Sequence, residues 1–395
     1  MNGGFATLSL FVNWGALVAA LLQCALLLLI ALSAAAIFIW LERKVSARIQ
    51  DRLGPTRVGG RFGWLQPPAD GLKLLCKEDI IPAAADRPLF RLAPYVSFCA
   101  AFCALPVLPF AEGWVVCRLD AALFFILAVM SIGIFGVILA GYASNSKWSL
   151  FGAMREAAQV VSYEIPLTLC VLAPVLLGGT LDLTELGKQQ SGWFLNWYVF
   201  HNPFSFLAFW VYFTCAVAST NRAPFDLPEA ESELVAGFMT EYSGFRWVVF
   251  FIAEYAAMFV VSGLAVVLFL GAWNGPLPIM TWLGLRAENG ALAAWFGNLF
   301  GAANFIVKSL LCVTAMIWLR WTLPRLRIDQ VMSTCLKYCL PLASVVLFGI
   351  MGWCYAFPQG LVGHVQETAL QREQPQPKFW ELIPPTPGDL PYPED

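Results

Sequence analysis

Long apolar runs alternate with short polar stretches along most of the chain. A helix needs about 20 predominantly apolar residues to cross the hydrocarbon core of a membrane. The first run is too long for a signal peptide and lacks a basic segment before it. The pattern predicts an all-α, polytopic integral membrane protein whose membrane domain covers residues 1–357. About eight transmembrane helices are expected, near 14–41, 93–112, 120–142, 158–178, 203–220, 246–272, 300–320 and 337–357.

Composition narrows the class of protein further. The 395 residues are 59% hydrophobic and 13% charged, whereas soluble chains carry about a quarter charged residues. These values exclude a disordered chain, a basic nucleic-acid binder and a disulfide-stapled secreted domain. The 11 cysteines form no C-x-x-C pair, and His201 and His364 are the only histidines. We therefore expect no metal ion and no iron–sulfur cluster, and no flavin or dinucleotide fingerprint occurs.

Lysine and arginine are unevenly distributed among the polar stretches. Those that follow the first, third, fifth and seventh predicted helices contain 18 of the 24 basic residues. Cytoplasmic loops of membrane proteins carry an excess of Lys and Arg. We therefore expect both termini in the periplasm and four cytoplasmic stretches, 42–92, 143–157, 221–246 and 320–337.

Three further segments stand out by composition. Residues 67–79 predict a short amphipathic helix at the membrane interface, within the first cytoplasmic stretch. The stretch 221–246 carries a net charge of −3, against the usual cytoplasmic bias. Residues 358–395 are rich in proline and predict a periplasmic tail that is extended or disordered.

Glu164, Glu254 and Lys308 fall inside predicted helices. The helical rise places the glutamates roughly 12–14 Å, and the lysine about 18 Å, from the cytoplasmic helix ends. An ionisable side chain at such depth costs several kcal/mol unless it is paired, hydrated or neutral. One interpretation is a structural Glu–Lys pair that joins helices. The favoured interpretation is a hydrated proton path, because Pro166 would open the helix beside Glu164.

The acidic stretch also has two interpretations. Asp226-Leu-Pro-Glu229 matches a helix capping box with proline in the first turn. Capping explains Glu231, Glu233 and Glu241 poorly, because residues two apart point to different sides of a helix. Carboxylates this close repel each other, so some would take up protons more readily. A cluster of this kind suits proton uptake at the mouth of a path, or else a vestibule that binds cations.

Basic residues also follow the first predicted helix closely. Topology anchoring and contacts with lipid phosphates explain about half of them. The others could face a polar headgroup or an acidic partner subunit. The six residues are Arg43, Lys44, Arg48, Arg52, Arg57 and Arg61.

Short motifs spread over residues 14–357 resemble one family, the membrane-embedded H subunits of bacterial NADH:quinone oxidoreductase (respiratory complex I). The mitochondrial counterpart is NADH dehydrogenase subunit 1. The acidic string beginning at Asn221 is the most specific match, whereas residues 58–63 depart from the family pattern. The matching motifs include Leu41-Glu42-Arg43-Lys44, Arg52-Leu-Gly-Pro55, Ala69-Asp-Gly-Leu-Lys73, Ser162-Tyr-Glu164, Asn221-Arg-Ala-Pro-Phe-Asp-Leu-Pro-Glu-Ala-Glu-Ser-Glu-Leu234 and Glu241-Tyr-Ser-Gly244.

The resemblance implies a subunit that has no redox centre and is not catalytic alone. It would form the membrane half of a chamber for the substrate quinone, with Arg43, Arg52, Asp70 and Lys73 at its entrance and walls. A charged path would start there and couple quinone reduction to proton translocation. That path is expected to contain Glu164, Asp226, Glu229, Glu231, Glu233, Glu241, Glu254 and Lys308.

The same resemblance implies partners and a location. The partners would be the peripheral-arm subunits that hold the flavin and iron–sulfur clusters, and neighbouring antiporter-like membrane subunits. The location would be the bacterial cell (inner) membrane. A related membrane anchor of a proton-pumping hydrogenase or ferredoxin-linked complex is the alternative. A stand-alone secondary transporter is disfavoured because no inverted repeat is visible, and a purely structural anchor because charges lie within the helices.

Overall fold

The computed structural model describes residues 14–228, 231–277 and 291–357. Within these ranges seven helices are long and apolar enough to cross a membrane, and a shorter apolar helix of 17 residues adds an eighth. Seventeen residues is the lower limit for a transmembrane helix. The predicted all-α polytopic fold is confirmed. The eight are α1 (Trp14–Ile49), α3 (Arg87–Ala104), α4 (Ala122–Ala143), α5 (Lys147–Gly178), α8 (Pro203–Ser219), α10 (Gly244–Phe269), α12 (Ala291–Thr322) and α13 with α14 (Ile328–Ser333 and Leu340–Ala356).

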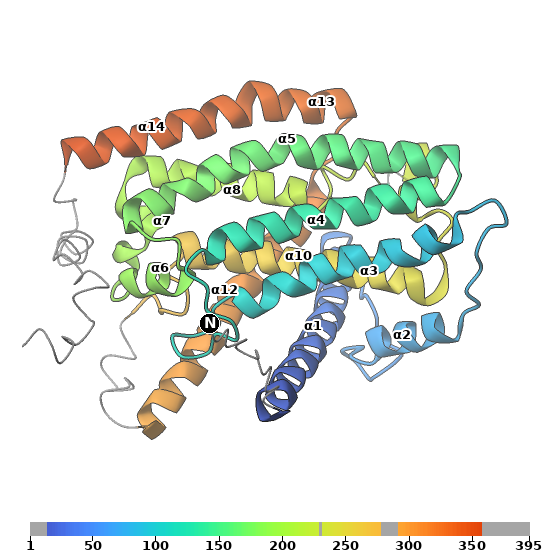
Figure 1. Ribbon diagram of the computed structural model, residues 1–395, viewed down its shortest axis with the longest axis horizontal. Coiled ribbons are helices and arrows are strands. Elements are labelled where there is room, and N and C mark those ends of the chain that lie inside the picture. Colours follow the sequence, from blue (N-terminus) through green and yellow to red (C-terminus); the bar gives the residue numbers. More distant parts are fainter. Residues whose placement is uncertain (1–13, 229–230, 278–290, 358–395) are drawn as a thin grey trace, which may run out of the picture.

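Most of these helices run nearly parallel (Figure 1). α3 packs on α4, α4 on α5, and α10 on α3, while α14 covers the outer side of α5 and α8. α1 and α12 run obliquely to the others and pack against each other and α10. A π-helical turn, Thr334–Cys339, joins α13 to α14. The largest cluster of buried apolar residues is formed chiefly by α5, α8, α10 and α12.

Several helix boundaries differ from those expected, and those of α1 and α5 concern charged residues. α1 continues to Ile49 rather than ending at 41, and α5 begins at Lys147 rather than at 158. In both cases the additional turns contain charged side chains, so they fall outside the apolar run although the backbone remains helical. The region 67–79 contains helix α2 (Gln66–Cys76), which begins with two prolines in its first turn, a favourable position for that residue. The predicted tail, 358–395, lies outside the described residues.

Prolines inside the membrane helices leave carbonyl groups that other elements satisfy. Pro166 has no N–H for the carbonyl of Ser162, and that oxygen accepts a hydrogen bond from Cys335 Sγ at 3.0 Å. Pro94 likewise frees the carbonyl of Phe90, which accepts from the Tyr242 hydroxyl at 3.2 Å. Backbone groups within a membrane must find such partners, because lipid supplies none. α5 therefore continues through Pro166 with one intrahelical bond missing near Glu164, and Cys335 binds the carbonyl that this proline frees.

The four connections that were expected in the cytoplasm meet at one end of the molecule, which we call the basic end. These connections are residues 50–86, 144–146, 220–243 and 323–327. Asp86 N donates to Ala143 O at 3.0 Å, and Leu326 N donates to Pro224 O at 3.0 Å. Arg246, in the first turn of α10, pairs with Asp79 at 2.9 Å.

The remaining connections form the opposite, distal end. Arg118 pairs with Asp182 at 2.8 Å, and Phe194 N donates to Pro276 O at 3.1 Å. A short helix α6 (Leu183–Gln189) starts there, and Asp182 caps it by accepting from Thr184 N at 2.8 Å. α7 (Tyr198–His201) leads from this end into α8. The chain therefore alternates between the two ends as the basic-residue pattern predicts.

Candidate functional site

The larger cavity, about 560 Å³, lies at the basic end between α1, α2, α10 and the segment that leads into α10. We call it the outer chamber. Its α1 and α10 walls are largely apolar and include Ile39, Trp247 and Phe251. α2 contributes a more polar wall because the face of this amphipathic helix that carries Asp70, Lys73 and Lys77 lines the chamber. The chamber can thus hold a molecule with an extended apolar part and a polar head.

Three of the four expected chamber residues line this cavity. Arg43 extends from α1 and pairs with Asp70 of α2, with Nη1 and Oδ2 2.6 Å apart. Lys73 lies one turn further along α2, with its Nζ 4.0 Å from Asp70 Oδ1. Arg52 is not among the lining residues; its side chain is exposed and Nε donates to Gln50 Oε1 at 2.7 Å. The Arg43–Asp70 pair therefore fixes α2 against α1 across the chamber.

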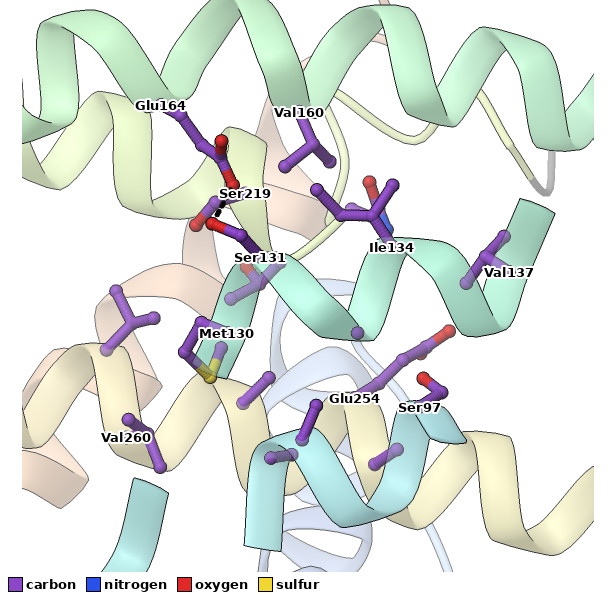
Figure 2. A pocket seen from close by; sticks show the side chains of 18 of the residues that line it. Ser97, Met130, Ser131, Ile134, Val137, Val160, Glu164, Ser219, Glu254 and Val260 are labelled. Carbon is purple, nitrogen blue, oxygen red and sulfur yellow. Dashed lines mark hydrogen bonds between the residues drawn. The ribbon is translucent and has the colours of Figure 1, made fainter. Parts of the chain in front are cut away.

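A smaller cavity, about 160 Å³, lies deeper among the helices, and we call it the inner cavity. Its walls come from α3, α4, α5, α8, α10 and residues 220–221. Glu164 of α5 and Glu254 of α10 both line it, although 90 positions separate them in sequence. Figure 2 shows Glu164 reaching toward Ser131 of α4, and Glu254 on the side nearer Ser97 of α3. Two of the expected path residues thus share one polar space.

A third glutamate, Glu156, also lines the inner cavity, and sequence reasoning missed it. It lies two turns before Glu164 on α5, is 4% exposed, and its Oε1 accepts from Asn221 Nδ2 at 2.7 Å. Glu164 Oε1 accepts from Ser131 Oγ at 2.6 Å. The expected helix start at 158 placed Glu156 in a loop. Its spacing of eight residues from Glu164 was the available signal, because residues seven or eight apart share a helix face.

Buried charges lie between the outer chamber and the inner cavity. Glu42 of α1 is 7% exposed and accepts hydrogen bonds from Tyr255 of α10 and Arg320 of α12. Arg222, in the connection after α8, is 5% exposed. Its Nη1 lies 3.6 Å from Glu42 Oε2, and its Nη2 lies 3.5 Å from Glu254 Oε2. We call Glu42, Arg222, Tyr255 and Arg320 the junction cluster, because it touches a lining residue of the inner cavity and adjoins Arg43 of the outer chamber.

Gln159 explains how Arg222 reaches this position. This buried side chain of α5 donates from Nε2 to the carbonyls of Ala218 and Phe225, at 2.7 and 2.8 Å. The last turn of α8 and the first residues of the connection after it are therefore bound to the middle of α5. Arg222 and Asn221 lie between these two bonds and so are directed into the helix bundle. Neither Glu42 nor Arg222 was expected as a site residue, because their partners are distant in sequence.

Two carboxylates of the acidic stretch pair with arginines of other segments, and they do not form one cluster with the rest. Asp226 pairs with Arg325 at 2.7 Å, and residues 227–228 form a turn, so Asp226 does not begin the expected helix. Glu233 pairs with Arg155 of α5 at 2.5 Å, and this hydrogen bond holds the pKa of Glu233 below its ordinary value. Glu231 begins α9 (Glu231–Leu234), Glu241 lies half-buried before α10, and Glu229 lies outside the described residues.

Lys308 lies apart from the carboxylates. Its Nζ donates to the backbone carbonyls of Leu270, Ala272 and Asn274, at the distal end. The alternative of a Glu–Lys pair is therefore wrong for this lysine. Within the described ranges, His, Cys, Asp and Glu side chains form no group of three that could hold a metal ion.

Comparisons with known proteins agree on one family. The model of the NADH dehydrogenase family matches residues 22–351. The chain is 45% identical over 339 residues to the H subunit of the NADH-quinone oxidoreductase of Anaeromyxobacter dehalogenans, covering 84% of this chain and 79% of that protein. It is 47% identical over 321 residues to the corresponding protein of Chlorobium luteolum (81% and 84% covered). For that of Geobacillus kaustophilus the identity is 44% over 342 residues (87% and 93% covered).

Proposed function

The chain belongs to the NADH dehydrogenase family, as a membrane subunit of NADH-quinone oxidoreductase, and we propose that it forms the membrane part of the quinone-binding chamber. We propose further that its buried charges start the path that couples quinone reduction to proton translocation. In this proposal the flavin and iron–sulfur centres belong to peripheral-arm subunits, from which the electrons arrive. The names of the relatives include NADH and quinone, which supports this proposal over a hydrogenase anchor.

The outer chamber is the observation that carries this proposal. A quinone has a planar headgroup with two carbonyl oxygens and a long apolar tail. The apolar walls from α1 and α10 suit the tail, and Arg43 and Lys73 could donate hydrogen bonds to a carbonyl oxygen or stabilise the negative charge that reduction creates. Asp70 would hold Arg43 in position through their pair.

The junction cluster supplies a physical link from the chamber to the inner cavity. Arg222 contacts both Glu42 and Glu254, and Glu42 adjoins Arg43 in α1. Charges in a protein interior interact more strongly than in water, because the surrounding dielectric is low. A change of charge at the quinone would therefore alter how Arg222 is shared between the two carboxylates. Glu254 would transmit that change to Glu156 and Glu164, which line the same cavity.

The proposed path takes up protons at the basic end. The acidic stretch, with Asp226, Glu231, Glu233 and Glu241, lies there, and the four predicted stretches that meet at this end, 42–92, 143–157, 221–246 and 320–337, hold 18 of the 24 Lys and Arg residues. By the positive-inside rule this end faces the cytoplasm and both termini face the periplasm of the bacterial inner membrane. Neighbouring membrane subunits would then receive the protons.

The chamber is tested by Arg43→Ala and Asp70→Asn in the assembled complex. Removing a hydrogen bond to a charged group costs about 1.5–3 kcal/mol, so quinone reductase activity should fall roughly tenfold or more. Oxidation of NADH by a hydrophilic artificial acceptor should be nearly unchanged, because that electron path ends in other subunits.

Arg52→Ala is the matched control, because it removes an exposed arginine, in the connection between α1 and α2, that does not line the chamber. It should retain quinone reductase activity. Equal losses of both activities in Arg43→Ala, or an equal loss of quinone reduction in Arg52→Ala, would count against the chamber.

A further inference from the structure

Lys308 occupies an enclosed site on α12. Its side chain is 8% exposed, and its Nζ lies 2.6 Å from the carbonyl oxygen of Leu270, 3.2 Å from that of Ala272 and 2.5 Å from that of Asn274. The ring of Trp197 covers the ammonium group from another side, with its centroid 4.1 Å from Nζ. The site therefore combines three carbonyl dipoles with one aromatic face, all of which favour a cation.

The partners of this side chain favour a charged ammonium group rather than a proton carrier. A lysine ammonium group has three N–H donors, and here all three are used by carbonyl oxygens. The carbonyls come from the segment directly after α10, where the helix dipole also favours a positive charge. A relay group must release its proton to an acceptor and regain it, but the partners of Lys308 are backbone carbonyls.

An apolar layer separates this cation from the inner cavity. Leu264 is the last residue of α10 that lines the cavity. The next five residues, 265–269, are at most 1% exposed and are all apolar. The ring of Phe269 packs on Tyr212 of α8, with centroids 5.7 Å apart. A proton leaving the cavity along α10 toward the distal end would meet first this layer and then Lys308.

We propose that Lys308 is a fixed internal cation that, together with this apolar layer, closes the inner cavity toward the distal end. The inference deepens the proposed function and rests on it: protons taken up at the basic end cannot cross this subunit and must leave sideways, toward a neighbouring subunit. A buried positive charge is an effective barrier to protons in membrane pores. Lys308 is then a positioning and sealing residue, and the role expected for it in the proton path is replaced.

The test is passive proton permeability of the purified complex in proteoliposomes, without NADH and under an imposed potassium diffusion potential. A pH-sensitive dye inside the vesicles reports proton flux. Lys308→Met keeps an unbranched side chain only one heavy atom shorter and removes the charge, so the flux should rise roughly tenfold as Coulomb repulsion is lost. Lys308→Arg keeps the charge and should stay at the parental flux. Lys188→Met is the matched control at an exposed distal position, where Lys188 pairs with Glu112 at 3.2 Å, and it should also leave the flux unchanged.

A passive proton flux in Lys308→Met vesicles equal to that of the parent would overturn the proposal. A fall in turnover with an unchanged ratio of protons to electrons would also overturn it, since that result marks a relay. If Lys308→Met does not assemble, Lys308→Gln replaces it, because it also removes the charge but keeps an N–H group that can donate to the carbonyls. Parental flux in Lys308→Gln would then overturn the proposal. Because the flux is measured without turnover, failure of the seal is distinguishable from failure of the quinone chamber.

Discussion

Residues of α10 line both the outer chamber and the inner cavity, but the two spaces differ in size and in the charged side chains that line them. The chamber is large, opens at the basic end, and carries its Arg43–Asp70 pair at one wall, where both side chains remain partly exposed. The inner cavity is less than a third of that size, and three glutamates line it. A wide apolar space suits a bulky substrate, whereas a narrow one lined with carboxylates suits protons. The pairing of the two spaces fits the proposed function, in which buried charges respond to a quinone bound beside them.

The largest expected effect comes from a change in the junction cluster, which lies between the outer chamber and the inner cavity. Arg222→Met would leave Glu42 and Glu254 without their shared cation, and removing one partner of a buried ion pair costs about 3–5 kcal/mol. We expect little assembled complex, measured by native gel and by the melting temperature of what remains. Arg57→Met, at an exposed position, is the matched control and should assemble normally. Parental levels of the Arg222→Met complex would show that assembly does not depend on the contacts of Arg222 with Glu42 and Glu254.

Glu164→Gln tests whether the inner cavity takes part in proton transfer. Glutamine keeps the shape and can still accept the hydrogen bond from Ser131, but it cannot exchange a proton. Groups that transfer protons typically contribute about 10²–10⁴-fold to rate, so turnover and proton pumping should fall together, by roughly tenfold or more. Both are measured on the assembled complex in proteoliposomes.

The matched control for that experiment is Glu185→Gln, the same change at the distal end, where Glu185 lies 3.6 Å from Arg118. It should keep both the rate and the stoichiometry. A normal rate and stoichiometry in Glu164→Gln would remove this carboxylate from the path and leave the inner cavity as a packing feature.

The smallest effect concerns the pair that Arg155, the residue directly before Glu156 in α5, forms with Glu233. The hydrogen bond from Arg155 lowers the pKa of Glu233. The stability from this pair is therefore fully present above the ordinary pKa of a glutamate, about 4.3, and is lost as pH falls through the lowered value. The difference in melting temperature between parent and Glu233→Gln should be small and constant from pH 7 to about 5, and should shrink below about 4. A difference that grew on acidification would contradict this assignment.

The sequence predicted the helices well because an apolar run of about 20 residues has one stable arrangement in lipid. It failed where polar residues continue a helix, and so it missed Glu156 in the early turns of α5. The depth of Glu254 could be predicted, but its pairing with Arg222 could not, because 32 positions and a loop separate them. Lys308 is the clearest case: its charge in a helix was evident, yet its partners are backbone carbonyls whose position depends on how the chain leaves α10.

Glu42 has a consequence for how the subunit is made. Its hydrogen-bond partners Tyr255 and Arg320 lie 213 and 278 positions later in the chain. At about 5–20 residues per second, a ribosome needs roughly 15–60 s to proceed from Glu42 to Arg320. Until Arg222 is synthesised, α1 contains a carboxylate that has neither of its cationic partners, and Arg320 follows only at the end of the interval. The buried contacts of Glu42 in α1 are thus among the last to form while the subunit is synthesised.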